Sequence, residues 1–394
     1  MPWHESSTMD ARVEFMREYL RGEEGMTELC ERHGISRKTG YKWRGRYRVE
    51  GVAGLAERSH APLRHGRATA PALAEAIEAL RRERPSWGAR KIIGKLAERE
   101  PGITWPSPST ADTILKRAGL VPGRRLRRRA PPRLGELTQP RHANHVWAAD
   151  HKGWISLGNG RRVEPLTVTD GFSRYLLSVS ATGSTASHEA WPLFERAFGE
   201  YGLPDVIRSD NGSPFASTGT TGLTQLSAWW IKLGIRHERI DPGAPQQNGR
   251  HERFHLTLLE AMRPPSADHA AQEQRFIAFK HDYNHERPHE ALGQKPPASV
   301  YRPSSRAMPD RLPEPVYAEE AAPRQVRGSG EIRWRGDLVY VSSALIGETV
   351  GVEETEQGQW LVRFFDVPIG VIDQTNRKLR RPDSKKTSSH EPKL

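Results

Sequence analysis

The chain has 394 residues, with 60 Lys and Arg against 48 Asp and Glu, which leaves a formal charge of +12 and a pI of about 9.9. This length exceeds what one hydrophobic core organises and predicts several domains. The basic balance favours a polyanionic partner. No run of about 18 apolar residues exists and the start of the chain lacks a signal-peptide core, so we expect no membrane partner and a cytoplasmic location.

The single cysteine, Cys30, excludes an intrachain disulfide framework and a zinc module of two His and two Cys. Cys30 itself is expected to be a small apolar filler on a helix.

Residues 1–58 have the pattern of a helix-turn-helix DNA-binding domain. Helical spacing predicts a helix over residues 11–20 and a short one over 27–34, and Ser36 is a good N-cap for a basic helix over 37–44. The last helix of such a domain enters the major groove. The candidate DNA contacts are therefore Arg37, Lys38 and Lys42, whereas Tyr41 and Trp43 are expected in the core.

Residues 66–120 predict a second helical unit, with helices over 72–82, 86–96 and 109–118. Arg90 and Lys91 are its candidate DNA contacts. The alternative is that this unit only packs against the rest of the chain or against a partner subunit.

Residues 121–140 are rich in arginine and proline and predict a basic linker. Residues 116–133 contain no acidic residue and eight basic ones: Lys116, Arg117, Arg124, Arg125, Arg127, Arg128, Arg129 and Arg133. Duplex DNA offers such a block counterion release, so the five arginines from Arg124 to Arg129 are candidate DNA contacts. A solvated linker without that role is the alternative.

Residues 141–301 predict a sheet flanked by helices. The expected strands are 147–155, 162–169, 175–181, 206–210 and 235–240, and the expected helices are 187–201, 223–233 and one that begins before Glu252.

Three acidic residues occupy distinct settings in this region. Asp150 and Asp210 end predicted strands, and Glu252 lies in the first turn of a predicted helix. A sheet and a helix can bring these three carboxylates together, where they would repel one another and need divalent cations to neutralise them. Hard oxygen ligands suit Mg²⁺ or Mn²⁺, and two such ions activate a water or a 3′ hydroxyl during phosphodiester chemistry.

Three strings around these acids and one later string carry a resemblance to a known family: residues 146–150, 206–212 and 245–252, and then 283–292. They resemble the integrase catalytic core of bacterial insertion-sequence transposases of the IS481 and IS3 type, in the DDE superfamily. The resemblance implies a ribonuclease-H-like α/β core with Asp150, Asp210 and Glu252 as catalytic, metal-binding residues. Supporting roles fall to Asn211, Gly212, Asn248 and Gly249 within the strings.

His255 lies three residues after Glu252 and is a further supporting candidate, either touching a phosphate or a metal-bound water or bonding to its neighbours on the helix surface. Leu256 and Leu259 are expected on the same inward face as Glu252. Between Asp210 and Glu252 there are 41 residues, more than the family pattern usually has. We assign the excess to a loop over residues 217–222. The rival third carboxylate is Glu238, which falls within a predicted strand.

The tail predicts a linker over residues 302–325, a small SH3-like β-barrel over 326–375 and a disordered segment over 376–394. The whole is thus expected to be a multidomain α+β protein.

The resemblance implies a transposase that binds the terminal inverted repeats of its element in double-stranded DNA, nicks the ends and joins the 3′ hydroxyls to target DNA. It further implies a homo-oligomer on DNA in the bacterial nucleoid. The alternatives are a catalytically inactive DNA-binding repressor and a ribonuclease-H-type hydrolase.

Overall fold

A computed structural model describes residues 8–58, 69–121, 137–241, 247, 249–373 and 375–381. The chain forms two compact units, Met1–Ala68 and Thr69–Leu394. Asn248 and the five arginines from Arg124 to Arg129 lie outside the described residues. No helix among the described residues is long and apolar enough to cross a membrane.

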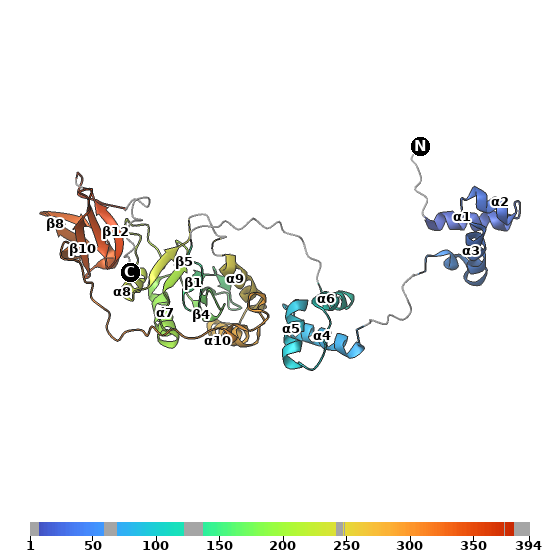
Figure 1. The fold of residues 1–394 in the computed structure, drawn as a ribbon, viewed down its shortest axis with the longest axis horizontal. Helices are drawn as coiled ribbons and strands as arrows, with labels where there is room; N and C mark the ends of the chain where they lie inside the picture. The colour runs from blue at the N-terminus through green and yellow to red at the C-terminus, as the bar shows by residue number, and fades with distance from the viewer. Residues whose placement is uncertain are drawn as a thin grey trace. The chain divides into compact units, whose positions relative to one another are not determined.

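The first unit contains three helices, α1 (Thr8–Arg21), α2 (Met26–Arg32) and α3 (Arg37–Glu50), followed by a 3-10 turn over Gly51–Leu55 (Figure 1). Ser36 caps α3, because its side chain accepts a hydrogen bond from the Thr39 backbone N–H at 3.2 Å. These helices share a small core of Phe15, Met16, Leu29, Cys30, Trp43 and Leu55.

Gly40 explains how α3 packs so closely on α2. A Cβ atom at this position would lie 2.5 Å from the Sγ atom of Cys30, so only glycine fits there. Cys30 and Trp43 are buried as predicted, but Tyr41 is 53% exposed, and its placement in the core was wrong. Leu20 is also exposed, because Phe15 takes the inward position of α1.

The second unit begins with three helices that share their own core: α4 (Pro71–Glu83), α5 (Ala89–Arg99) and α6 (Pro108–Arg117). Trp87, Ile77 and Ile92 are almost fully buried in it. Charged residues of α5, and Arg84 directly after α4, contact residues 282–290: Lys95 pairs with Glu286 at 3.0 Å, Arg84 with Asp282 and Arg90 with Glu290.

The central sheet is built from β1 (Val146–His151), β2 (Ile155–Ser156), β3 (Arg162–Asp170), β4 (Leu176–Thr182), β5 (Val206–Ser209) and β6 (Arg236–Arg239). Its order is β2-β3-β1-β5-β6, with β4 also paired to β3. The first strands are antiparallel, whereas β5 is parallel to both β1 and β6. The loop expected over residues 217–222 lies between β5 and the next helix.

Helices cover both faces of this sheet (Figure 1). α7 (Ser187–Tyr201) and α8 (Gln225–Lys232) pack on one face, around Trp147, Ile207 and Trp230. α9 (Gly249–Ala261) and α10 (His269–His281) pack on the other, through Phe254 and Phe276. A π-helical turn over Asp282–Glu286 and two short 3-10 turns, Glu290–Leu292 and Pro297–Ser299, follow α10.

The C-terminal strands form a five-stranded antiparallel sheet in the order β13-β12-β11-β10-β7, beside a two-stranded hairpin β8-β9. The strands are β7 (Ala322–Gln325), β8 (Glu331–Trp334), β9 (Asp337–Tyr340), β10 (Thr349–Glu354), β11 (Trp360–Phe364), β12 (Val367–Ile372) and β13 (Leu379–Arg380), with a 3-10 turn over Ser343–Leu345.

The pairing of these described strands does not close into a ring, so the predicted SH3-like barrel is not confirmed. β7 falls in the expected linker, and its Pro323 hid it, because proline is accepted only at a sheet edge such as this one. β13 falls in the expected disordered tail, where two residues pair with β12.

Candidate active site

Two parallel strands bring Asp150 and Asp210 together. The register of β1 and β5 pairs Val146 with Val206 and Ala148 with Arg208. Extended by two residues along each parallel strand, the same register places Asp150 beside Asp210. Side chains alternate along a strand, and Trp147 and Ile207 point into the core under α7 and α8. Both aspartates therefore face the opposite side of the sheet, which α9 covers.

The electrostatics of the two carboxylates are coupled. Burial first, and then the charge of Asp210, raise the pKa of Asp150 to about 7. The side chain of Asp150 is only 22% exposed, so water screens this repulsion weakly. A positive charge placed between the two oxygens would offset the repulsion.

The turn after β5 fixes the Asp210 carboxylate. The backbone N–H of Gly212 donates to its Oδ1 at 3.0 Å, and a Cβ at Gly212 would lie 3.1 Å from its Oδ2. The Asn211 side chain donates to the carbonyl of Ile240 at 2.7 Å and so ties the turn to the end of β6. This arrangement gives Asn211 and Gly212 a positioning role, which the sequence strings suggested without its geometry.

Helix α9 presents a different face from the one expected. Its buried residues are His251, Phe254, His255 and Leu258, whereas Leu256 is 50% exposed. Glu252 lies one residue after His251, is exposed, and follows Gly249 in the first turn. The prediction that Leu256 and Glu252 face inward was wrong, since the true apolar stripe is displaced by one residue.

Sequence reasoning missed His251, although the i, i+4 spacing of His251 and His255 was a visible signal. Both side chains meet Thr167, whose Oγ1 lies 2.7 Å from Nε2 of His251 and 2.9 Å from Nε2 of His255. Thr167 is the register partner of Asp150 on the neighbouring strand. Burial lowers the pKa of His251 to about 3 and that of His255 to about 2, so both rings are neutral.

Two donor sets around Asp150 could serve a cation. Asp150, His251 and His255 have ligand atoms within 4.8 Å of one another. Both histidines, however, contact Thr167 through Nε2, and Nδ1 of His251 also lies 3.2 Å from the Thr169 hydroxyl, so in this structure they hold α9 to the sheet. The Asp150 and Asp210 oxygens fit a hard divalent cation such as Mg²⁺ or Mn²⁺ better, because their mutual repulsion is what such a cation offsets.

The rival acid Glu238 has another task. Its Oε2 lies 2.6 Å from a guanidinium nitrogen of Arg208, and its Oε1 accepts hydrogen bonds from the backbone and hydroxyl of Thr138. Hydrogen bonds from Thr138 lower the pKa of Glu238, despite its partial burial. This carboxylate stabilises the β5–β6 edge.

The candidate DNA contacts differ in their surroundings. Arg37, Lys38 and Lys42 are exposed on α3. Arg90, by contrast, pairs with Glu290, and Lys91 donates to the carbonyl of Pro288 at 2.5 Å.

Family models match most of the chain in successive pieces. A helix-turn-helix domain matches residues 11–62, a homeodomain-like domain 39–115, integrase core domains 140–245 and 233–297, and the C-terminal domain of IS481 family transposases 321–380. Together with the paired aspartates, these matches define a polynucleotidyl transferase of the DDE superfamily.

Similar proteins narrow that class. The chain is 32% identical over 179 residues to the 39.2 kDa protein of insertion element IS476 from Xanthomonas euvesicatoria, covering 44% of this chain and 50% of that protein. It is 30% identical over 241 residues to the 31.7 kDa protein of IS407 from Burkholderia multivorans, covering 60% of this chain and 83% of that one. The chain belongs to the insertion-sequence transposases of the IS481 and IS3 type.

Among solved structures, the magnesium-bound HTLV-2 integrase catalytic core domain is 18% identical with a TM-score of 0.31, over 41% of this chain and 98% of that one. A chain of the simian T-cell lymphotropic virus intasome is 18% identical with a TM-score of 0.37, over 78% and 99%.

Proposed function

We propose that this protein binds the terminal inverted repeats of its element, nicks the ends and joins the freed 3′ hydroxyls to target DNA. The observation that carries this proposal is the electrostatic coupling of Asp150 and Asp210 on the sheet face covered by α9. Two acids whose repulsion calls for cations, beside helical DNA-binding domains, suit phosphodiester cleavage and transfer better than binding alone.

In this proposal Asp150, Asp210 and Glu252 hold two Mg²⁺ or Mn²⁺ ions. Bound there, such ions supply activation of a water or a 3′ hydroxyl and neutralisation of the leaving oxygen. The chain's own residues orient these acids: Gly212 and Asn211 hold Asp210, and Thr167, with His251 and His255, holds the β1–α9 contact. Glu252 is exposed on the first turn of α9, where it can turn toward ligands.

The nucleophile belongs to water and then to DNA. Water attacks the phosphodiester at the element's end and releases a 3′ hydroxyl, and that hydroxyl attacks a target phosphodiester with departure of a target 3′ oxygen. One bond forms and one breaks in each step, so no covalent protein intermediate is needed. We propose that a homo-oligomer on DNA, at the bacterial nucleoid, brings two ends together.

The DNA-binding work is divided along the chain in this proposal. Arg37, Lys38 and Lys42 on α3 read the repeat in the major groove, and Arg124, Arg125, Arg127, Arg128 and Arg129 contact phosphates irrespective of sequence. Arg90 and Lys91 are the weakest candidates for base reading, because both are engaged by residues 288–290.

Cleavage of duplexes that carry the element's ends tests the proposal, with Mg²⁺, with Mn²⁺ and with a chelator. We expect nicking and strand transfer with either metal and none with the chelator. A repressor without activity would bind the ends and leave them intact, and a ribonuclease-H-type hydrolase would cut the RNA of a hybrid and transfer no strand.

A further inference from the structure

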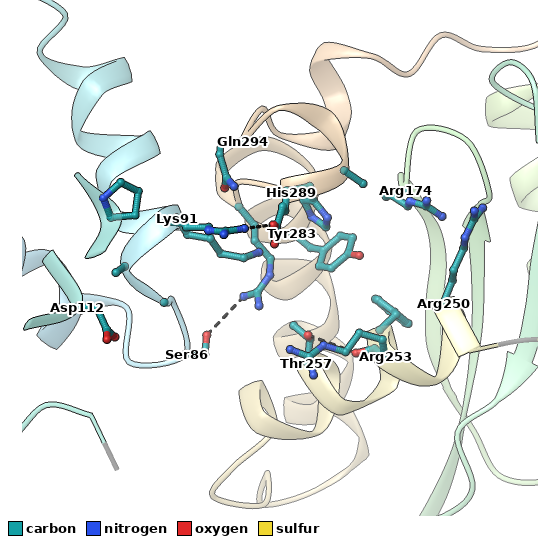
Figure 2. A pocket seen from close by; sticks show the side chains of 18 of the residues that line it. Ser86, Lys91, Asp112, Arg174, Arg250, Arg253, Thr257, Tyr283, His289 and Gln294 are labelled. Atoms are coloured by element: carbon teal, nitrogen blue, oxygen red, sulfur yellow. Dashed lines mark hydrogen bonds and ion pairs between the residues drawn. The ribbon is translucent and has the colours of Figure 1, made fainter. Parts of the chain in front are cut away.

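A pocket of about 1070 Å³ lies between α5 of the second helical unit and α9 of the core (Figure 2). Six basic side chains line it from separate parts of the chain: Arg90 and Lys91 on α5, Arg174 in the turn between β3 and β4, Arg250 and Arg253 on α9, and Arg287 after the π-helical turn. Figure 2 shows Arg250 and Arg253 on one wall and Lys91 on the other.

Arg90 pairs with the Glu290 carboxylate, whereas three of the other five cations donate to neutral oxygens. Lys91 donates to the Pro288 carbonyl, Arg174 to the Gly171 carbonyl at 2.9 Å, and Arg287 to the Ser86 hydroxyl at 3.4 Å. Within the part of the chain that the structure describes, no carboxylate lies at ion-pair distance from the five cations other than Arg90.

The acids that do line the pocket are already occupied. Asp112 pairs with Lys116 at 2.6 Å, and Glu290 pairs with Arg90. The pocket thus collects positive charge that its own walls leave uncompensated.

The pKa values of Lys91 and His289 reflect this excess of positive charge. Burial first, and then the charges of Arg287 and Arg253, lower the pKa of Lys91 to about 7. His289 has a pKa lowered to about 3, by burial first and then by Lys91, Arg287 and Arg174. Its Nε2 is buried among the described residues without a hydrogen-bond partner and lines the same pocket.

The position of the pocket on α9 indicates what kind of anion it takes. Arg250 and Arg253 share the first turns of α9 with Glu252, which does not itself line the pocket, so the pocket lies on the helix that carries the proposed third metal ligand. Its cations are spread over three core segments and α5 instead of converging on one point, and its volume exceeds what a single phosphate fills. Successive phosphates of a nucleic acid strand match such a spread of charge.

We propose that this pocket binds the phosphate backbone of the DNA strand processed at the Asp150 and Asp210 site, and that the second helical unit forms one of its walls. This inference rests on the proposed function. It changes the role of Lys91, which becomes part of a sequence-independent clamp instead of a reader of bases.

The test uses the full-length chain and three variants: the double variant Arg250→Gln with Arg253→Gln, the single variant Lys91→Gln, and Arg196→Gln as a control. Arg250, Arg253 and Arg196 are all exposed, so their substitution leaves the fold intact. Arg196 lies on α7 and does not line the pocket.

Affinity for a labelled duplex with the element's end, and for a scrambled duplex, is measured by anisotropy across a salt series. For the double variant we expect the slope of log affinity against log salt to fall by about 0.9 for each phosphate that the protein no longer neutralises, equally for both duplexes. The Lys91→Gln slope should fall by the amount expected for a single phosphate, and the Arg196→Gln slope should match wild type. Unchanged slopes in both pocket variants would overturn the inference.

Inorganic phosphate distinguishes a strand site from a free-anion site. One outcome is that phosphate binds the wild type and binds the double variant more weakly, while the salt slope for DNA binding is the same in both proteins. The pocket would then bind a small anion, and its assignment to a DNA strand would be wrong. If the wild type cleaves DNA and the pocket variants keep the wild-type salt slope, this inference alone is wrong. If the wild type never cleaves DNA but the variants show the expected change in salt slope, only the proposed transposase activity is wrong.

Discussion

The Nδ1 atom of His255 lies 3.7 Å from Oδ2 of Asp150, so helix α9 reaches the end of β1 through an imidazole. The other ring nitrogen of His255 contacts the Thr167 hydroxyl, which also donates to the Asp150 carbonyl at 3.0 Å. That hydroxyl has one proton, so both histidines donate to its oxygen through Nε2. His255 Nδ1 is then left without a proton and faces the carboxyl of Asp150.

Substitution of Thr167 tests this network. Thr167→Val removes the oxygen that two buried imidazoles share, and we expect a loss of about 1–3 kcal/mol in the free energy of unfolding. Denaturant titration measures it. Thr167→Ser keeps the hydroxyl and should recover most of that loss. Equal stability of the valine and serine variants would show that the hydroxyl does not hold α9 to the sheet.

The pKa of Asp150 predicts a pH dependence of stability without divalent metal. This pKa is raised from 3.8 to about 7, so the folded protein holds a proton that the unfolded chain has lost. Stability contributed by that proton is present below pH 4 and is lost as pH rises through 7. Asp150→Asn should therefore stabilise the metal-free protein at pH 8, by up to about 4 kcal/mol.

Unfolding of both proteins between pH 5 and pH 8, in the presence of a chelator, measures this effect. The comparison cancels the buried histidines His237, His251 and His289, whose lowered pKa values destabilise both proteins alike in acid. Added Mg²⁺ should stabilise the wild type and leave the asparagine variant almost unchanged. A difference between the two proteins that does not vary with pH would contradict the raised pKa.

Gly40 and Cys30 predict a compensating pair in the first unit. Gly40→Ala places a methyl group against the Cys30 sulfur and should cost about 1–3 kcal/mol. Cys30→Ala removes that sulfur, so the double variant should be more stable than the sum of the single changes predicts. Amide hydrogen exchange within α1 to α3 of the full-length chain reports on this unit. Additive effects would mean that the sulfur is not what excludes a side chain from position 40.

Residue patterns along the sequence predicted the strands and helices of the core well. The side-chain roles that they did not predict depend on partners that are distant in sequence. The predicted strands correspond to β1, which carries Asp150, and to β5, which ends just before Asp210, and a strand's period of two sets the face that each side chain takes. The role of Glu238 depends on Arg208 in the adjacent strand and on Thr138, far away in sequence. The face of α9 was misjudged because His251 and His255 are polar residues, while a hydroxyl on β3 allows their burial.

The third acid is the remaining test of the site. If Glu252 is a metal ligand, Glu252→Gln should lower end cleavage and strand transfer by at least about 100-fold, since an amide keeps the shape but removes the charge that holds a cation. Folding and DNA affinity should be unchanged, because Glu252 is exposed. Cleavage and joining assays, with unfolding and anisotropy on the same samples, separate these effects.

Glu238→Gln is the matched control, and its expected behaviour is the opposite. Loss of the ion pair with the 12% exposed Arg208 side chain should lower the free energy of unfolding by about 1–3 kcal/mol, while the folded protein retains its cleavage activity. The two variants therefore differ in which measurement changes. If Glu252→Gln is fully active and Glu238→Gln is stable but inactive, the third metal ligand is Glu238 on β6. Glu238 would then have to leave Arg208 and Thr138 when DNA binds.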